Sequence, residues 1–151
     1  MSILALLMLA TAAAAQAPQS EEDAYLAESE AELPGTLLNN PIDVVWTSHG
    51  DDVTSKVVKA PDIPGQRAFS IRVKVAKANP WDIAAHGSVS GGVAAGETVL
   101  VAFWARAAAV SKETGAGGVQ ARLQQRSAPY KSVAETRLPL GENWQVHYFS
   151  G

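Results

Sequence analysis

Flat aromatic rings beside planar polar side chains are the residues of this chain with the clearest chemical use. Trp81 stands in "NPWD" between polar neighbours, and Tyr130 follows a proline in "SAPYKS". Trp104 adjoins Phe103 in the apolar stretch "TVLVAFWARA". Rings of this kind stack on the apolar C–H faces of sugars, and covering about 100 Å² would contribute roughly 2–3 kcal/mol. These rings are therefore candidates for carbohydrate contacts.

A ladder of forked polar side chains accompanies the rings. "GVQARLQQR" places amide and guanidinium groups at alternate positions, with small or apolar residues between them. Such groups make paired hydrogen bonds to the hydroxyl edges of sugars. The predicted carbohydrate-binding residues are Trp81, Tyr130, Arg122, Gln124, Gln120 and Trp104. For each ring the alternative is packing in the core, and for the ladder it is an ordinary solvated strand face.

Signatures of catalysis and of metal binding are absent. "GSVSGG" lacks the central serine of a nucleophile elbow, and "GAGG" lacks the lysine and hydroxyl residue of a phosphate loop. His49, His86 and His147 do not have metal-ligand spacing. Glycoside hydrolysis needs two facing carboxylates, and nothing in the sequence pairs any two glutamates. We therefore predict a protein that is not an enzyme and requires no cofactor.

Charge is distributed unevenly along the chain. The sequence holds 15 acidic and 12 basic residues and carries a net charge of −3. Six of the acidic residues lie within residues 19–33, whereas every Lys and Arg lies beyond residue 55. The weak basic excess of the remainder argues against nucleic acid as a partner. The absence of cysteine excludes disulfides and thiolate metal sites.

The N-terminal residues have the composition of a secretory signal peptide. "ILALLMLATAAAAQA" is an apolar run that ends in small residues, and it is shorter than the ~20 residues of a membrane span. We assign residues 1–17 to the signal, cleaved after Ala15 or Ala17; an uncleaved anchor is the alternative. Residues 18–35 are then an acidic linker or short helix. This predicts a secreted or periplasmic protein with no membrane association after cleavage.

Period-two alternation predicts an all-β domain over residues 36–151. "RAFSIRVKVAK" (residues 67–77) and residues 118–126 alternate apolar and polar side chains, as half-buried strands do. Glycine- and proline-rich turns separate the segments. Further strands are expected at residues 43–47, 53–59, 99–106, 132–138 and 144–149. Short antiparallel strands of this kind favour a β-sandwich or barrel, with Trp46 and Trp144 in the core.

The order of these segments resembles a known family. "VKAPDIPGQRAFSIRVKVAKANPWDIAAHGSV", "GETVLVAFWARA", "VQARLQQRSAPYKSV" and "LPLGENWQVHYF" are similar to the carbohydrate-binding modules of families 4 and 9, the CenC-like group found beside bacterial xylanases. The resemblance runs from Trp46 to the last residue. It implies a jelly roll of two antiparallel sheets that binds a polysaccharide such as xylan or β-glucan. Some members hold a structural calcium ion, but no calcium ligands map onto this chain.

One departure from the family leaves alternatives open. Members usually continue past the strand that contains "WQVHYF", whereas this chain stops at Gly151. The jelly roll is therefore expected to lack its last strands and to be marginally stable. One alternative is the N-terminal fragment of a xylanase-like glycoside hydrolase without its catalytic domain. Another is a structural or adhesive β-sandwich of the cell envelope that binds no sugar.

Overall fold

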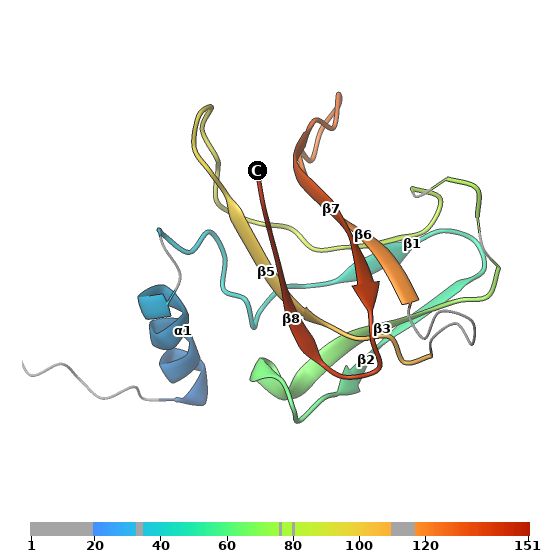
Figure 1. Ribbon diagram of the computed structural model, residues 1–151, viewed down its shortest axis with the longest axis horizontal. Coiled ribbons are helices and arrows are strands. Elements are labelled where there is room, and N and C mark those ends of the chain that lie inside the picture. Colours follow the sequence, from blue (N-terminus) through green and yellow to red (C-terminus); the bar gives the residue numbers. More distant parts are fainter. Residues whose placement is uncertain (1–19, 33–34, 76, 80, 110–116) are drawn as a thin grey trace, which may run out of the picture.

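The chain is predominantly β in a computed structural model that describes residues 20–32, 35–75, 77–79, 81–109 and 117–151 (Figure 1). The predicted signal peptide, residues 1–17, lies outside the described residues. The elements in chain order are α1 (Glu21–Glu32), β1 (Thr47–His49), β2 (Val53–Lys59), the 3₁₀ turn η1 (Pro64–Gln66), β3 (Arg67–Val73), β4 (Ala84–His86), β5 (Leu100–Ala105), β6 (Gly117–Gln124), β7 (Ser132–Leu140) and β8 (Gln145–Ser150).

The acidic segment forms the helix α1, at one end of the molecule (Figure 1). Ser20 precedes the helix, and its Oγ accepts a hydrogen bond from the backbone N–H of Asp23 at 3.1 Å. This is an N-cap, which satisfies one of the backbone donors that the first helical turn leaves free. Asp23, in the first turn, also suits the positive end of the helix dipole. Among the described residues, no helix is long and apolar enough to cross a membrane.

The strands form four antiparallel pairs. β1 pairs with β4, β2 with β3, β5 with β8, and β6 with β7. β2–β3 and β6–β7 join neighbouring segments of the chain, whereas β5–β8 joins strands that are separated by the whole β6–β7 hairpin. The all-β fold class predicted from the sequence is confirmed. Within the described part of the chain, each hydrogen-bonded ladder contains two strands.

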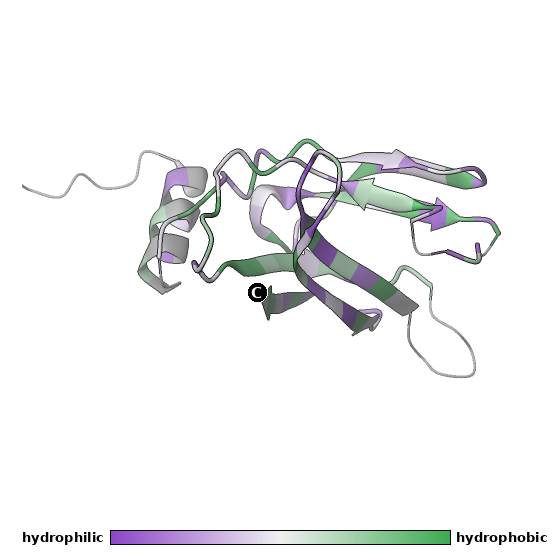
Figure 2. Cartoon of the chain, turned by 90° about the horizontal axis from the view of Figure 1, so that it is seen from above, coloured by the Kyte–Doolittle hydropathy of each residue, from purple (hydrophilic) through white to green (hydrophobic). Residues whose placement is uncertain are grey.

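The β5–β8 pair shows how alternation divides a strand pair into two faces. Exposure alternates along β5 residue by residue, as the sequence predicts. Val101 pairs with Phe149 and Phe103 pairs with His147 on the inner face. On that face the Phe103 ring lies 6.3 Å from the Phe149 ring in an edge-to-face arrangement, and 5.7 Å from the His147 ring. Bands of opposite hydropathy along the strands are visible in Figure 2.

The inner face of β5–β8 meets the apolar face of the β6–β7 hairpin. Gly151 extends the β5–β8 ladder, because it exchanges backbone hydrogen bonds of 3.1 and 2.9 Å with Val99. A Cβ atom built on Gly151 would collide with Val133 O and would lie 2.8 Å from the Cβ of Ala134. Val99 and Ala134 are buried at this junction, and Ala60 is the only other buried apolar residue among those described.

The short strands β1 and β4 differ from the sequence prediction. A strand was expected at residues 43–47, but β1 covers Thr47–His49, and β4 was not predicted. β4 consists of "AAH", which is too short to show a period of two. The expectation that Trp46 lies in the core is wrong, because this residue is 44% exposed. It precedes a strand pair only three residues long, which offers little apolar surface to cover the ring.

Candidate functional site

An exposed aromatic face lies on the outer side of β5–β8. We define the aromatic face as Leu100, Trp104 and Tyr148, which are 40%, 39% and 53% exposed. Trp104 is opposite Val146, and Tyr148 is opposite Ala102, so the two rings occupy diagonal positions on adjacent strands. Diagonal neighbours on one sheet face are about 7–8 Å apart, within reach of aromatic side chains. The face is thus an apolar surface with two rings, and the small residue Ala102 lies opposite Tyr148.

Arg106 contacts Trp144 at the end of the strand pair where β5 ends and β8 begins. The guanidinium carbon of Arg106 lies 5.1 Å from the centre of the Trp144 ring, within cation–π range. Arg106 Nη1 also donates a hydrogen bond to the carbonyl oxygen of Glu142 at 3.4 Å. Trp144 was expected in the core and is half-buried. These contacts orient the Arg106 fork next to the last residues of β5.

The predicted polar ladder is present on the β6–β7 hairpin. Gln120, Arg122 and Gln124 share one face because they occupy alternate positions along β6. Gln120 and Arg122 are opposite Arg137 and Glu135 on β7, and Gln124, beyond a register shift, is opposite Ser132. We call this the polar face. Val119, Ala121 and Leu123 occupy the opposite side, as the alternation predicts.

Arg122 is already engaged by a carboxylate on the polar face. Its Nε lies 2.9 Å from Glu135 Oε2, and Ser132 Oγ donates to the same oxygen at 3.2 Å. Gln120 is half-buried, and its Oε1 atom is enclosed without a hydrogen-bond partner among the described residues. Gln124 is exposed next to the register shift at Leu123. On the polar face, the exposed amide of Gln124 is therefore available to a ligand, whereas the guanidinium of Arg122 is already neutralised by Glu135.

Tyr130 belongs to the turn that joins β6 and β7. The turn projects beyond the strand pair (Figure 1), and Tyr130 is 56% exposed. Its backbone N–H donates to Ser127 O at 2.8 Å, and the N–H of Gln125 donates to Lys131 O at 2.9 Å. Tyr130 has a φ of 54°, in the left-handed region, and the turn holds it in this conformation.

Trp81 lies in a different part of the molecule, in the segment that leads into β4. It is 67% exposed, and its carbonyl oxygen lies 3.1 Å from His49 Nε2 in β1. The next residue, Asp82, accepts hydrogen bonds from the backbone and side chain of Asn79 at 3.2 to 3.4 Å, which forms a tight turn. None of the described hydrogen bonds or ring contacts joins Trp81 to β5, β6, β7 or β8.

The structure brings together some of the predicted residues and separates others. Gln120, Arg122 and Gln124 share a face, and Tyr130 ends the same hairpin. Trp104 lies on the outer face of β5–β8, whereas the contact with β6–β7 uses the inner face. Tyr148, the second ring of the aromatic face, was not among the residues predicted from the sequence. The alternation of "WQVHYF" predicts that Tyr148 and Phe149 project from opposite faces of the strand. Only the pairing of β8 with β5 places Tyr148 beside Trp104.

The described residues contain no group of three or more His, Cys, Asp or Glu side chains able to hold a metal ion. The rings of His49 and His86 are neighbours, with their centres 5.5 Å apart. His86 Nε2 lies 2.8 Å from Thr47 Oγ1, and His49 is engaged with the Trp81 carbonyl. His86 thus connects β4 to β1, and His49 connects β1 to the segment that leads into β4.

Comparison of the chain with protein-family models, with curated proteins and with solved structures finds no significant match.

Proposed function

We propose that this chain is a non-catalytic polysaccharide-binding protein whose aromatic face stacks on the sugar rings of a glycan such as xylan or β-glucan. The observation that carries the proposal is that Trp104 and Tyr148 share one face of β5–β8, with 39% and 53% of their surfaces exposed. Two rings on adjacent strands offer a glycan chain two stacking positions. Burying about 100 Å² on each ring would contribute roughly 2–3 kcal/mol before ordering costs.

The same proposal assigns the strand pairs to a jelly-roll β-sandwich. Each of the three longer pairs has a face with apolar side chains, for example Phe69 and Ile71 on β3 and Leu123 on β6. Sheets with one apolar face are stabilised by stacking those faces together. The contact between β5–β8 and β6–β7 at Val99 and Ala134 is of this type. Together with the apolar N-terminal run, this supports an exported binding module, secreted or periplasmic.

Affinity electrophoresis through gels that contain soluble xylan or mixed-linkage β-glucan tests the proposal. We expect the unmodified protein to be retarded by at least one of these glycans. The double variant Trp104→Ala/Tyr148→Ala removes both rings of the aromatic face and should weaken binding by about tenfold or more. Far-UV circular dichroism checks that the variant retains its strands.

Trp81→Ala/Tyr130→Ala is the matched control, because it also removes one Trp and one Tyr. These rings are more exposed than those of the aromatic face and lie elsewhere, so their loss should leave retardation nearly unchanged. If this control loses binding and the aromatic-face variant retains it, the glycan binds at the loops. A folded protein that no glycan retards would contradict the proposed function.

A structural or adhesive role is the second candidate, favoured by apolar side chains that face solvent. Val57 lies in the middle of β2 and is 64% exposed, and Val45 is 80% exposed. Exposed apolar groups on a strand with a free edge promote association between chains. Sedimentation of the purified protein over a range of concentrations distinguishes this role, since assembly requires self-association that glycan binding does not.

A further inference from the structure

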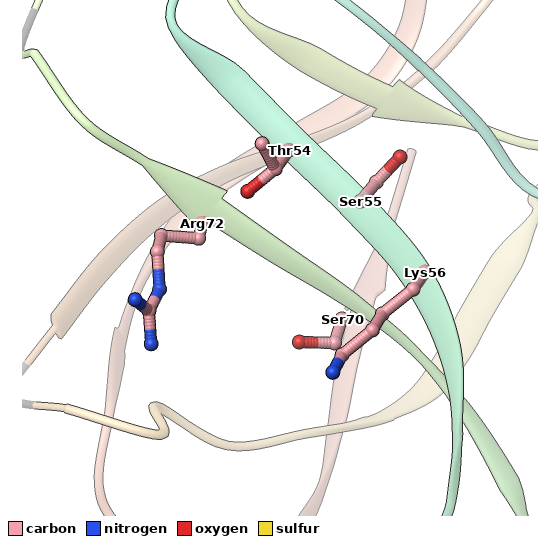
Figure 3. Close-up of a pocket in the computed structure, with 5 residues that line it drawn as sticks. All are labelled: Thr54, Ser55, Lys56, Ser70 and Arg72. Carbon is pink, nitrogen blue, oxygen red and sulfur yellow. The ribbon is translucent and has the colours of Figure 1, made fainter.

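A polar hollow of about 350 Å³ lies on β2–β3 (Figure 3). Its lining residues are Thr54, Ser55, Lys56, Ser70 and Arg72. Thr54 pairs with Arg72, and Lys56 pairs with Ser70, so these four residues project from one face of the strand pair. Ser55 points to the other side in Figure 3 and lies with its Oγ 2.8 Å from that of Ser48. The volume is at the lower end of the range for small-molecule sites.

The hollow is lined by cations without an opposing carboxylate. Its lining contains one Lys and one Arg and no acidic residue. The ion pairs found among the described residues are Lys77–Asp52 and Arg122–Glu135, so neither Lys56 nor Arg72 is neutralised there. Both residues are exposed. An anion would therefore find two uncompensated positive charges at this site.

The register of β2–β3 places these two charges close to each other. Arg72 is opposite Thr54, two positions from Lys56, so the two cations are diagonal neighbours on the same face. Figure 3 shows both side chains extending away from the ribbon on the same side as Ser70. A single bound oxyanion on this face could therefore contact both charges.

The chemistry of the lining matches an oxyanion. A guanidinium donates two parallel hydrogen bonds to a carboxylate or sulfate, and an ammonium adds a compact charge. The hydroxyls of Thr54 and Ser70 lie on the same face and can donate as well. We infer that the hollow on β2–β3 binds the carboxylate or sulfate group of an acidic polysaccharide through Lys56 and Arg72. This inference rests on the proposed polysaccharide-binding function and adds a second site, separate from the aromatic face.

An acidic glycan fits this face better than a nucleic acid does. The protein has a net charge of −3, whereas nucleic-acid-binding domains carry an extended basic stripe. The hollow offers two cations together with hydroxyl donors, a set suited to one anionic group among neutral hydroxyls. Phosphates that repeat along a nucleic acid would need a longer row of cations.

Affinity electrophoresis at low ionic strength, with polygalacturonate and with dextran sulfate, tests the inference. We expect at least one of these polyanions to retard the full chain, and the one that retards it more identifies the group bound. The double variant Lys56→Gln/Arg72→Gln should weaken that binding by about tenfold or more, as expected for the loss of charge-assisted hydrogen bonds. Arg72→Lys keeps the positive charge but lacks the parallel N–H donors of the guanidinium, so this variant should bind the polyanion with intermediate affinity.

Lys59→Gln/Arg67→Gln is the matched control. These residues are opposite each other on the same strand pair but on its other face, and the substitution removes the same charges. The control should change polyanion binding by no more than about twofold, as is usual for exposed charges. Equal losses in the two double variants would mean diffuse attraction and would overturn the inference. The absence of retardation by both polyanions would also overturn it.

Binding measurements with a neutral glycan and with a nucleic acid distinguish the remaining explanations. Binding to mixed-linkage β-glucan should be unchanged in Lys56→Gln/Arg72→Gln, because it depends on Trp104 and Tyr148. Retardation by xylan or β-glucan but by neither polyanion overturns this inference alone. Retardation by polyanions but by neither xylan nor β-glucan overturns the role of the aromatic face alone. If oligothymidylate is bound as tightly as polygalacturonate, and through the same two residues, the assignment to an acidic glycan is wrong.

Discussion

Lys77 and Asp52 form an ion pair that connects the segment after β3 with the turn before β2. Lys77 Nζ donates to Asp52 Oδ2 at 2.9 Å, and the backbone N–H of Lys74 donates to Asp52 O at the same distance. Asp52 has a φ of 62°, in the left-handed region that Asp tolerates better than most residues. The hydrogen bond that Lys77 donates to Asp52, together with the negative charges of Asp52, Asp51 and Asp82, raises the pKa of Lys77 above its ordinary value of 10.5.

This pKa shift predicts a loss of stability in alkaline solution. A lysine whose pKa is raised by folding stabilises the folded state at every pH below its unfolded pKa, and this contribution is lost as the pH rises through the folded pKa. The urea midpoint should therefore decrease above pH 10.5 partly because of Lys77. In Lys77→Met this part of the decrease should be absent and the midpoint at neutral pH slightly lower, as for other exposed ion pairs.

Lys74→Met provides the comparison for this prediction. Lys74 is exposed, close to Lys77 in sequence, and outside the ion pairs found among the described residues. Its replacement should leave the alkaline decrease as it is in the unmodified protein. Identical pH profiles for all three proteins would show that the Lys77–Asp52 pair contributes nothing measurable.

The β5–β8 pair is the element in which one strand register serves stability on one face and, under the proposed function, glycan binding on the other. Its inner face contains Phe103 and Phe149, which pack edge to face, and its outer face contains Trp104 and Tyr148. Adjacent positions on one strand therefore have opposite roles. This arrangement allows the outer rings to be changed without removal of the inner rings that stabilise the pair.

Two neighbouring residues of β8 should differ in their effect on stability. Phe149→Ala removes a half-buried ring from the inner face and should lower the free energy of unfolding by about 2–3 kcal/mol. Tyr148→Ala removes a ring that is 53% exposed and should cost less than about 1 kcal/mol. Urea unfolding of both variants measures the difference. Equal losses, or a larger loss for Tyr148→Ala, would mean that the outer face is covered in solution.

The longer strands could be predicted from the sequence because their alternation is visible locally. β2 has the predicted bounds, residues 53–59, and β6 places Gln120, Arg122 and Gln124 on one face as expected. The failures concern short elements. β4 has three residues with two alanines, and such a segment has neither alternation nor strong strand propensity. It forms because β1 lies beside it, which local sequence does not reveal.

At the scale of the whole molecule, the described residues bury little apolar surface. Ala60, Val99 and Ala134 are the buried apolar residues, and all three are small. Each ladder contains two strands, so every strand among the described residues has one edge that no neighbouring strand of its ladder covers. Burial of large apolar side chains is the main source of folding free energy. A protein with this distribution depends on partial burial of many side chains.

We therefore expect low stability for the whole chain. The free energy of unfolding should lie at or below about 5 kcal/mol, the lower end of the usual range, in urea titrations monitored by circular dichroism. A bound glycan should raise the midpoint, since a ligand of the folded state stabilises it by mass action. A cooperative transition with a free energy well above this limit would show that the protein has a more extensive core.

The alternation of side chains, the turns and the unbalanced charge of residues 19–33 were sufficient to determine an all-β chain with an acidic N-terminal segment. They were also sufficient to place Gln120, Arg122 and Gln124 on one face, because a period of two is a property of a single strand. Only the tertiary structure decided that Tyr148 lies beside Trp104 and that Lys56 and Arg72 share one face of β2–β3. Both neighbourhoods depend on the partner and register of a strand, which are set by contacts between segments rather than within one.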